Sequence, residues 1–383
     1  MTARFFTLSS ALFGTLLCAL SLGGRLFYLM SYLLMAMLLI ALGSVLSGFF
    51  GLSIMQQPDS IKAERGKSVQ LLIDVRYAGF LPLAPLDVKL SLPEGESDFL
   101  LETRLLRSVH VSVPCPLRHV GAFRVGVQSV LISDVFGLFR FKKKTGAPLP
   151  EVLSLPRAFD IEKLSFPAQD DGQAVTNRSG EDVTSPEDTR LYREGDPLKR
   201  IHWKLSQRAG ELIVRKFEVP APPDTLILMD CTDPVGHEGQ EDGLFRLRDT
   251  LCETALSSAK EQMQGHKPVR VPLYSVRGGE FHADNMGHLA LLKEELAAIP
   301  FGGGQPFCQI LNLELRRMRR TGASIVITTR LNADIVEAVN NIRRSGPSVR
   351  FYFVCFDPDK EEYRPFIARM QRQMVEVCYV TPA

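Results

Sequence analysis

The chain has 383 residues, which is enough for two or three domains that each bury a core of their own. Its 45 Lys and Arg residues nearly balance 43 Asp and Glu residues, so the net charge is +2. This balance excludes a strongly basic or strongly acidic body, and it gives no electrostatic reason to expect nucleic acid as a partner.

The first 57 residues are almost free of charge. No Asp, Glu, Lys or Arg occurs at residues 5–24 or at residues 26–57. Crossing the hydrocarbon core of a bilayer takes roughly 20 apolar residues, so we predict two membrane-spanning helices over about residues 5–24 and 26–50. Gly23, Gly24 and Arg25 between them suit the tight loop of a hairpin, and residues 1–57 form the predicted transmembrane unit.

A hairpin returns the chain to the side on which it began. Basic residues flank its outer ends at Arg4, Lys62, Arg65 and Lys67. By the positive-inside bias these ends face the cytoplasm, although Arg25 lies on the opposite side. We therefore expect a multi-pass protein of the cell inner membrane, in contact with the lipid bilayer and with cytoplasmic soluble domains. A cleaved secretory signal ending near Gly24 and a core hairpin of a soluble protein remain open as alternatives.

The seven cysteines are scattered along the chain, and none belongs to a CxxC pair. Several lie inside apolar runs, where a free thiol behaves as a small buried hydrophobic group. This distribution is typical of a reducing compartment and agrees with the cytoplasmic placement.

Residues 58–145 show short apolar runs separated by Pro and Gly. We predict strands at residues 68–76, 86–92, 107–113, 121–131 and 138–142. Their spacing of roughly ten residues favours a β-sandwich over βαβ units. Residues 146–189 are rich in Pro, Asp, Gly, Gln and Ser and are interpreted as a linker and loop.

From residue 221 to residue 383 apolar strands alternate with amphipathic helices. The predicted strands are residues 225–230, 269–276, 324–328, 349–356 and 375–380. The predicted helices are residues 244–264, 288–298, 308–320, 333–345 and 363–373. Such alternation predicts a Rossmann-like α/β domain with a mainly parallel sheet and helices on both faces.

Residues 190–220 read as one helix followed by a strand. Asp196 suits an N-cap, Pro197 the first helical position and Gly210 the stop. The buried stripe of this helix would consist of Leu198, Ile201, Leu205 and Ala209.

The same segment resembles the signature of the bacterial family called domain of unknown function 58. The family pattern is Arg-x-Tyr, Gly-Asp, Arg-x-Ile-x-Trp and a later Arg. The matching residues are Arg190, Tyr192, Gly195, Asp196, Arg200, Ile201, Trp203 and Arg208. The family's upstream Ser-Asp-Pro-Phe-Gly-Leu-Phe appears at residues 133–139, with Val135 where Pro is usual.

This resemblance implies a membrane hairpin, a β-sandwich and a von Willebrand type A-like C-terminal domain. Members are often encoded beside a MoxR-type AAA ATPase and a transglutaminase-like membrane protein, and no reaction is assigned to them. Both proteins are therefore expected partners. The arginines, Tyr192 and Trp203 of the signature would form a docking or anion-binding surface, or else the arginines pair with Asp196 while Trp203 anchors the two domains.

A metal-binding type A domain has Asp-x-Ser-x-Ser after its first strand, then a Thr and a later Asp. Here Asp230 and Thr232 are followed by Pro234 in place of the second Ser, Gln305 replaces the Thr, and Thr329 with Arg330 replaces the carboxylate. We expect a degenerate site without metal or other cofactor. Asp233 is a substitute ligand should Mg²⁺ bind.

Enzyme motifs are missing: the chain has no HExxH, no GxSxG and no P-loop. We expect no catalytic residues and a non-catalytic interaction or scaffold protein. It would be an accessory partner of the MoxR-type ATPase in the maturation of envelope or stress-related complexes. The alternative is a metal-dependent adhesion module or hydrolase that uses Asp230, Thr232 and Asp233.

Overall fold

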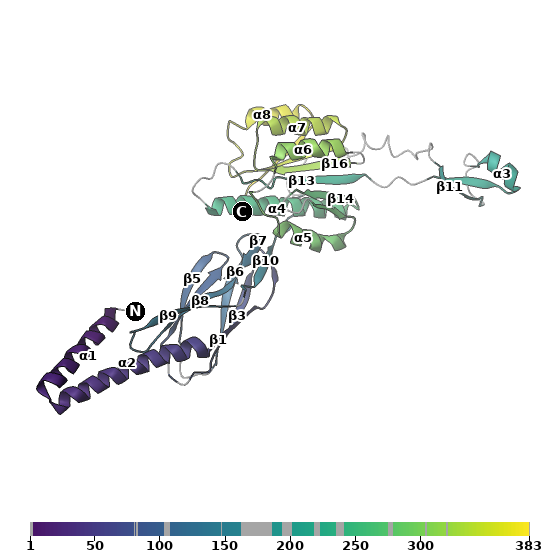
Figure 1. Cartoon of the computed structure of the whole chain (residues 1–383). Coiled ribbons are helices and arrows are strands. Elements are labelled where there is room, and N and C mark those ends of the chain that lie inside the picture. Colours follow the sequence, from purple (N-terminus) through teal and green to yellow (C-terminus); the bar gives the residue numbers. More distant parts are fainter. Residues whose placement is uncertain are drawn as a thin grey trace. The chain divides into compact units, whose positions relative to one another are not determined.

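The computed structural model describes residues 3–79, 81, 83–102, 108–146, 148–161, 186–193, 201–217, 223–234, 241–274, 279–302, 305–318 and 321–382. The chain divides into two compact units, Met1–Leu155 and Pro156–Ala383 (Figure 1).

The first unit begins with a helical hairpin of α1 (Ala3–Leu22) and α2 (Arg25–Gly51). Both helices are long and apolar enough to cross a membrane. Gly23 makes the reversal possible because its φ of +67° is costly for any residue with a Cβ. The predicted hairpin is confirmed, and large apolar side chains such as Phe13, Leu20 and Leu33 are exposed along it.

The last turns of α2 belong to the core of the β domain. Ala41 and Val45 are buried in the same apolar cluster as the strands. The Nζ of Lys143 donates hydrogen bonds of 2.6 Å to the carbonyls of Phe49 and Leu52, which satisfies acceptors at the end of the helix. The hairpin and the β domain are therefore packed together.

The described residues of the first unit continue with the strands β1 (Leu52–Pro58), β2 (Lys62–Glu64), β3 (Ser68–Tyr77), β4 (Leu86–Leu92), β5 (Gly95–Leu101), β6 (Ser108–Pro116), β7 (Gly121–Arg124), β8 (Gly126–Ser133), β9 (Arg140–Lys144) and β10 (Glu151–Leu155). The sheets have the orders β1-β3-β6, β5-β4-β8-β9 and β2-β10-β7. One core contains Leu71 and Ile73 of β3 together with Val88 of β4 and Val130 of β8. The β1-β3-β6 sheet and the β5-β4-β8-β9 sheet therefore share a core, as the sandwich prediction requires.

Several predicted boundaries in this unit are wrong. The β domain begins at Leu52, directly after α2, because β1 pairs with β3 along its whole length. The predicted strand over residues 121–131 is two strands, β7 and β8, which pair with different partners. The proposed linker over residues 146–189 contains β10, which pairs with β2 and β7, and the beginning of a strand at Pro186.

The second unit contains a six-stranded sheet built from β13 (Asp224–Met229), β14 (Val269–Leu273), β15 (Gly279–Ala283), β16 (Thr321–Thr328), β17 (Ser348–Val354) and β18 (Glu376–Val380). Its order is β15-β14-β13-β16-β17-β18. All neighbours are parallel except β15, which is antiparallel to β14. In chain order this is the 3-2-1-4-5-6 arrangement of a doubly wound fold.

Helices cover both faces of this sheet (Figure 1). They are α4 (Glu241–Gln264), α5 (Leu289–Ala297), α6 (Phe307–Arg317), α7 (Ala333–Arg344) and α8 (Arg364–Gln371), with a short 3₁₀ helix η3 (Met286–His288) before α5. The apolar cluster beneath α6, α7 and α8 contains Leu226, Val326 and Phe351. Every predicted strand and helix of this domain is confirmed within a few residues, whereas the edge strand β15 was missed because its residues are largely polar.

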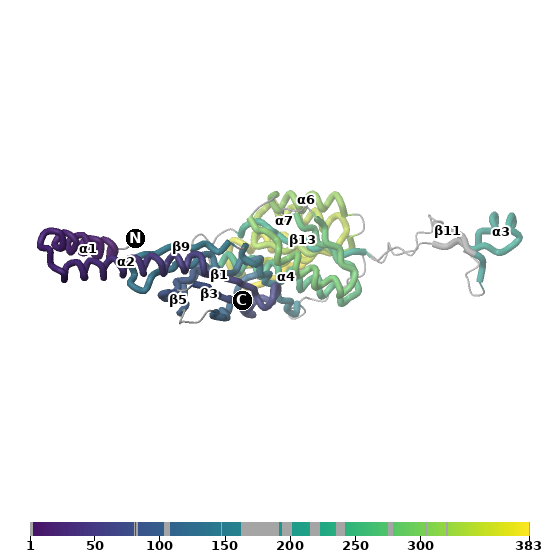
Figure 2. Tube along the Cα trace, turned by 60° about the horizontal axis from the view of Figure 1, so that its bottom comes forward, coloured from purple at the N-terminus to yellow at the C-terminus, as the bar shows by residue number. Residues whose placement is uncertain are grey.

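The signature segment forms a two-stranded antiparallel sheet of β11 (Pro186–Leu191) and β12 (Ile213–Phe217), with α3 (Trp203–Ala209) between them in the chain. Figure 2 shows α3 as a short coil. Gly210 ends the helix at φ +72°, as predicted. The predicted start at Asp196 and Pro197 lies outside the described residues. Ile201 forms a β-bridge with Val214, so the chain is still extended there and the helix begins only after His202, whose side chain accepts from the amide of Leu205.

Candidate functional site

The candidate site lies at the carboxyl edge of the six-stranded sheet. Asp230 directly follows β13, and Thr328 ends the neighbouring parallel strand β16. The helices after these strands, α4 and α7, cover opposite faces of the sheet (Figure 1). In doubly wound folds the crevice at such a switch point is the usual place for ligands.

Asp230 is fully buried, and both of its carboxylate oxygens are occupied. Its Oδ1 accepts hydrogen bonds from the backbone N–H of Thr232 at 3.0 Å and from the hydroxyl of the same residue. Its Oδ2 accepts from the hydroxyl of Thr328 at 2.8 Å. A buried carboxylate is tolerated only when it is hydrogen-bonded in this way.

Two arginines hold Asp233, at the rim of the same edge. The guanidinium of Arg248, on α4, donates to the carboxylate, and Nη2 of Arg330 donates to the backbone carbonyl. Arg248 also lies 5.4 Å from the ring centroid of Phe301. Three buried polar atoms of the described residues here have no hydrogen-bond partner: Nε of Arg248, Nε of Arg330 and Oγ1 of Thr329.

Gly302 brings the loop before α6 against this cluster. Its amide donates to the carbonyl of Cys231 at 3.2 Å, and its φ is +89°. A Cβ at this position would collide with the carboxylate of Asp233. Glycine is thus required both by the backbone conformation and by the close approach. Gln305 of the same loop is exposed, and the two intervening glycines lie outside the described residues.

These residues do not fit a divalent cation. Mg²⁺ requires near-octahedral oxygen ligands at about 2.0–2.1 Å. Asp233, the substitute ligand, is paired with Arg248, and Arg330 places a second positive charge beside it. Within the part of the chain that the structure describes, no three His, Cys, Asp or Glu side chains come together in a metal-binding group. The carboxyl edge instead presents arginines where the type A pattern has a carboxylate.

Cys231 lies between Asp230 and Thr232 as a free thiol. Burial, with a smaller contribution from the negative charge of Asp230, raises the pKa of Cys231 to about 12. The thiolate is the nucleophilic form of cysteine, so this residue is held inert at neutral pH.

The structure describes only some of the signature residues. Arg190 is on β11, the amide of Tyr192 donates to the carbonyl of Leu212 at 2.8 Å, and Trp203 and Arg208 are on α3. Gly195, Asp196 and Arg200 lie outside the described residues. Trp203 is 63% exposed on α3.

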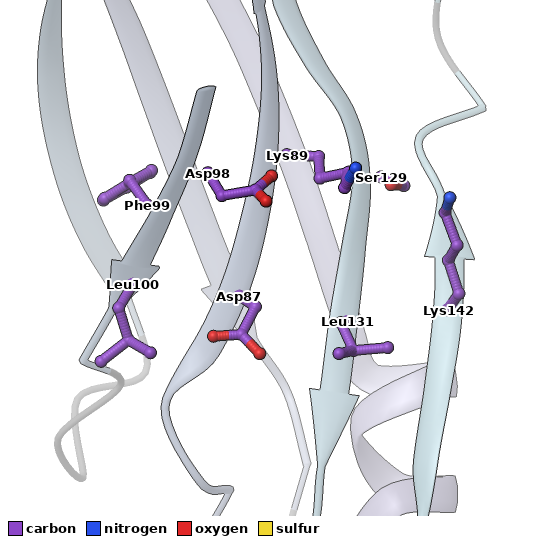
Figure 3. A pocket seen from close by; sticks show the side chains of 8 residues that line it. All are labelled: Asp87, Lys89, Asp98, Phe99, Leu100, Ser129, Leu131 and Lys142. Carbon is purple, nitrogen blue, oxygen red and sulfur yellow. The ribbon is translucent and has the colours of Figure 1, made fainter. Parts of the chain in front are cut away.

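A hollow of about 400 Å³ lies on the outer face of the β5-β4-β8-β9 sheet (Figure 3). Its lining comprises Asp87, Lys89, Asp98, Phe99, Leu100, Ser129, Leu131 and Lys142. Two acids and two lysines give this face a mixed charge that favours neither cations nor anions. No sequence motif marks this hollow, although the alternation of polar and buried residues along β4 indicates a solvent-facing side.

Arg248 was also missed by the sequence analysis. It lies 15 positions after Asp233 on a helix and pairs with it only because α4 returns across the sheet edge. Asp230, Thr232 and Asp233 are brought together as expected from their adjacency, and Thr328 joins them through the pairing of β13 with β16.

No family model and no curated protein matches the chain. Among solved structures it is similar to Cwp6 from Clostridium difficile, at 9% identity and a TM-score of 0.20 over 86% of this chain and 53% of that one. It is also similar to a glycosyl hydrolase family 2 member from Bacteroides cellulosilyticus DSM 14838, at 8% identity and a TM-score of 0.15 over 84% and 38%. The chain thus spans about half the length of the first. TM-scores this low establish no shared fold.

Proposed function

We propose that this chain is a membrane-anchored, non-catalytic interaction protein whose von Willebrand type A-like α/β domain docks a partner at the carboxyl edge of its sheet. The observation that carries the proposal is the cluster of Asp230, Thr328, Asp233, Arg248 and Arg330 at the switch point of the doubly wound sheet. The arginine-rich form of this cluster favours a docking surface over a metal-dependent adhesion module or hydrolase.

The hairpin supports the anchoring part of the proposal. The 20 residues of α1 extend about 30 Å, which equals the thickness of a hydrocarbon core. Side chains along the outer surface of the hairpin are apolar and exposed, an arrangement that is unfavourable in water and favourable in lipid. With the flanking positive charges, this supports a multi-pass protein of the inner membrane with cytoplasmic soluble units.

Three features support docking at the carboxyl edge. The edge is the position where doubly wound folds bind ligands. Arg248 and Arg330 place two cationic side chains at this edge, and arginine is favoured at the centres of protein interfaces. The resemblance of the signature segment points to a MoxR-type AAA ATPase as the partner, with the transglutaminase-like membrane protein as a second component.

The exposed signature helix supplies a second contact in this proposal. Trp203 and Arg208 are both exposed on α3, and an exposed tryptophan is an effective anchor for a partner.

Site-specific photo-crosslinking in cells tests the proposal. A photoreactive residue replaces Gln305 at the carboxyl edge or, as a matched control, Ser348 at the opposite edge of the same sheet; both are exposed. We expect the Gln305 variant to crosslink to a MoxR-type AAA ATPase and the Ser348 variant not to do so. Equal crosslinking from both edges, or no ATPase in either product, would contradict the docking site.

A further inference from the structure

The turn of residues 133–139, between β8 and β9, is held in one conformation by a buried carboxylate. Asp134 is almost fully buried, and its two oxygens accept hydrogen bonds from the amides of Phe136 at 2.9 Å and Phe139 at 2.6 Å. Gly137 has φ +71° and donates its amide to the carbonyl of Asp134 at 3.0 Å. A turn braced in this way presents its outer side chains in fixed positions.

This turn packs against the beginning of α1. The ring centroids of Phe5 and Phe139 are 5.2 Å apart. A Cβ added at Gly137 would lie 3.0 Å from Nη1 of Arg4. Both Figure 1 and Figure 2 show the start of α1 beside β9, with the hairpin running away from the sheets. The turn is therefore level with the first helical turn of α1.

The length of α1 places this level in the bilayer. Its 20 residues extend about 30 Å, the thickness of the hydrocarbon core. When α1 spans that core, as the proposed function requires, its first turn lies at the boundary between acyl chains and headgroups. The turn packed beside it lies at the same boundary.

The exposed side chains of the turn are of the apolar and basic types that are favourable at the boundary between acyl chains and headgroups. Leu138 and Phe139 are buried in the β domain, whereas Val135 is 59% and Phe136 41% exposed. Arg140, the first residue of β9, is also exposed and follows the turn directly. An apolar pair next to a cation is the pattern of residues that enter the interfacial layer, where the ring is apolar and the phosphates are anionic.

We propose that the turn of residues 133–139 is a second membrane contact, in which Val135 and Phe136 enter the interfacial layer of the leaflet next to the β domain. The contact rests on the proposed membrane anchorage and goes beyond it. It holds the β domain against the bilayer surface instead of leaving the domain to pivot on the hairpin. It also gives the braced turn a role that docking at the carboxyl edge of the α/β domain does not explain.

Fluorescence quenching by lipids tests this contact in the full-length chain. The single tryptophan is first removed as Trp203→Phe, and a reporter is introduced as Phe136→Trp. The matched control is Ile61→Trp, a position 64% exposed in the same domain, where the carbonyl of Ile61 accepts from Leu153 in the β2-β10-β7 sheet. The proteins are reconstituted in phosphatidylcholine–phosphatidylglycerol vesicles with or without bromine on the upper acyl chain.

We expect brominated lipid to quench Phe136→Trp at least threefold more strongly than Ile61→Trp, and the emission of Phe136→Trp to be shifted to shorter wavelength. Val135→Trp provides a second reporter in the same turn should Phe136→Trp misfold. Resistance of each protein to an alkaline carbonate wash reports separately on the hairpin.

A protein that resists the wash but shows no quenching in the turn would refute the membrane contact and leave the anchor standing. Equal quenching of the turn and of Ile61→Trp would refute it as well, since the contact would not be specific to the turn. Release of the protein by the wash would refute both the anchor and the contact.

Discussion

A buried ion network in the α/β domain provides the sharpest prediction of stability. Arg270, on β14, lies 3.0 Å from Asp224, 2.6 Å from Glu280 and 3.0 Å from Glu314. Glu314 is fully buried on α6. Burial lowers the pKa of Arg270, but the hydrogen bond to Glu280 and the charges of Asp224 and Glu314 outweigh it and raise the pKa above its ordinary value. The arginine therefore stays charged at every pH at which the protein is folded.

Replacing Arg270 by Leu removes the cation that compensates Glu314. Removing one member of a buried ion pair costs about 3–5 kcal/mol. We expect about 3 kcal/mol, because Glu314 keeps a hydrogen bond from the hydroxyl of Tyr274 and an exposed partner, Arg317, at 3.7 Å. Glu314→Leu should cost less, about 1.5 kcal/mol, because Arg270 still has two carboxylates.

Hydrogen exchange of the full-length chain measures these costs locally, because the slowest amides of β13, β14 and β16 report the free energy of opening of this sheet. At about 1.4 kcal/mol per factor of ten, Arg270→Leu should accelerate their exchange roughly a hundredfold, and Glu314→Leu roughly tenfold. The double variant should exchange more slowly than Arg270→Leu, since no buried charge is left alone. If Arg270→Leu exchanged no faster than Glu314→Leu, the assignment of Arg270 as the compensating charge would be refuted.

Three further predictions concern the carboxyl edge. Calorimetric titration of the full-length chain with Mg²⁺ should show no micromolar binding, and saturable binding that Asp230→Ala abolishes would contradict the degenerate site. Because the pKa of Cys231 is about 12, only about one thiol in 10⁴ is ionised at pH 8, against about one in ten for an ordinary thiol. The rate of alkylation of Cys231, followed by mass spectrometry, should therefore rise about tenfold between pH 9 and pH 10, and a rise of only about twofold would show an ordinary thiol pKa. Gly302→Ala should lower the melting temperature more than Gly346→Ala does. Both glycines have positive φ, so either substitution costs about 1 kcal/mol or more, but only a Cβ at Gly302 also collides with Asp233. Equal shifts in melting temperature would contradict that close approach.

The elements that could be predicted are those whose signal is local. Uncharged runs over residues 5–24 and 26–57 are sufficient for the hairpin, and repeated apolar runs separated by amphipathic stretches are sufficient for the α/β domain. The end of α3 could also be predicted from the sequence, because glycine readily adopts the positive φ that ends a helix at Gly210. Adjacency along the chain likewise placed Asp230, Thr232 and Asp233 together.

The remaining features depend on contacts between residues far apart in the chain. β10 could not be separated from the loop after it, because its pairing with β2 and β7 is invisible in its own composition. Ile201, predicted to lie in a helix, instead forms a bridge with Val214, and the helix begins only after His202. Local propensity is a weak bias that one tertiary pairing readily overrides.

The composition and order of the residues alone determined that this protein has an apolar hairpin, a β domain and an α/β domain, because each depends on a repeat within a short window. Only the tertiary structure decided that Arg248 and Arg330 close on Asp233, and that the turn braced by Asp134 stands beside the first turn of α1. Both arrangements join segments separated by many residues. No local pattern encodes them, because they arise only when the sheet edges and the hairpin have packed.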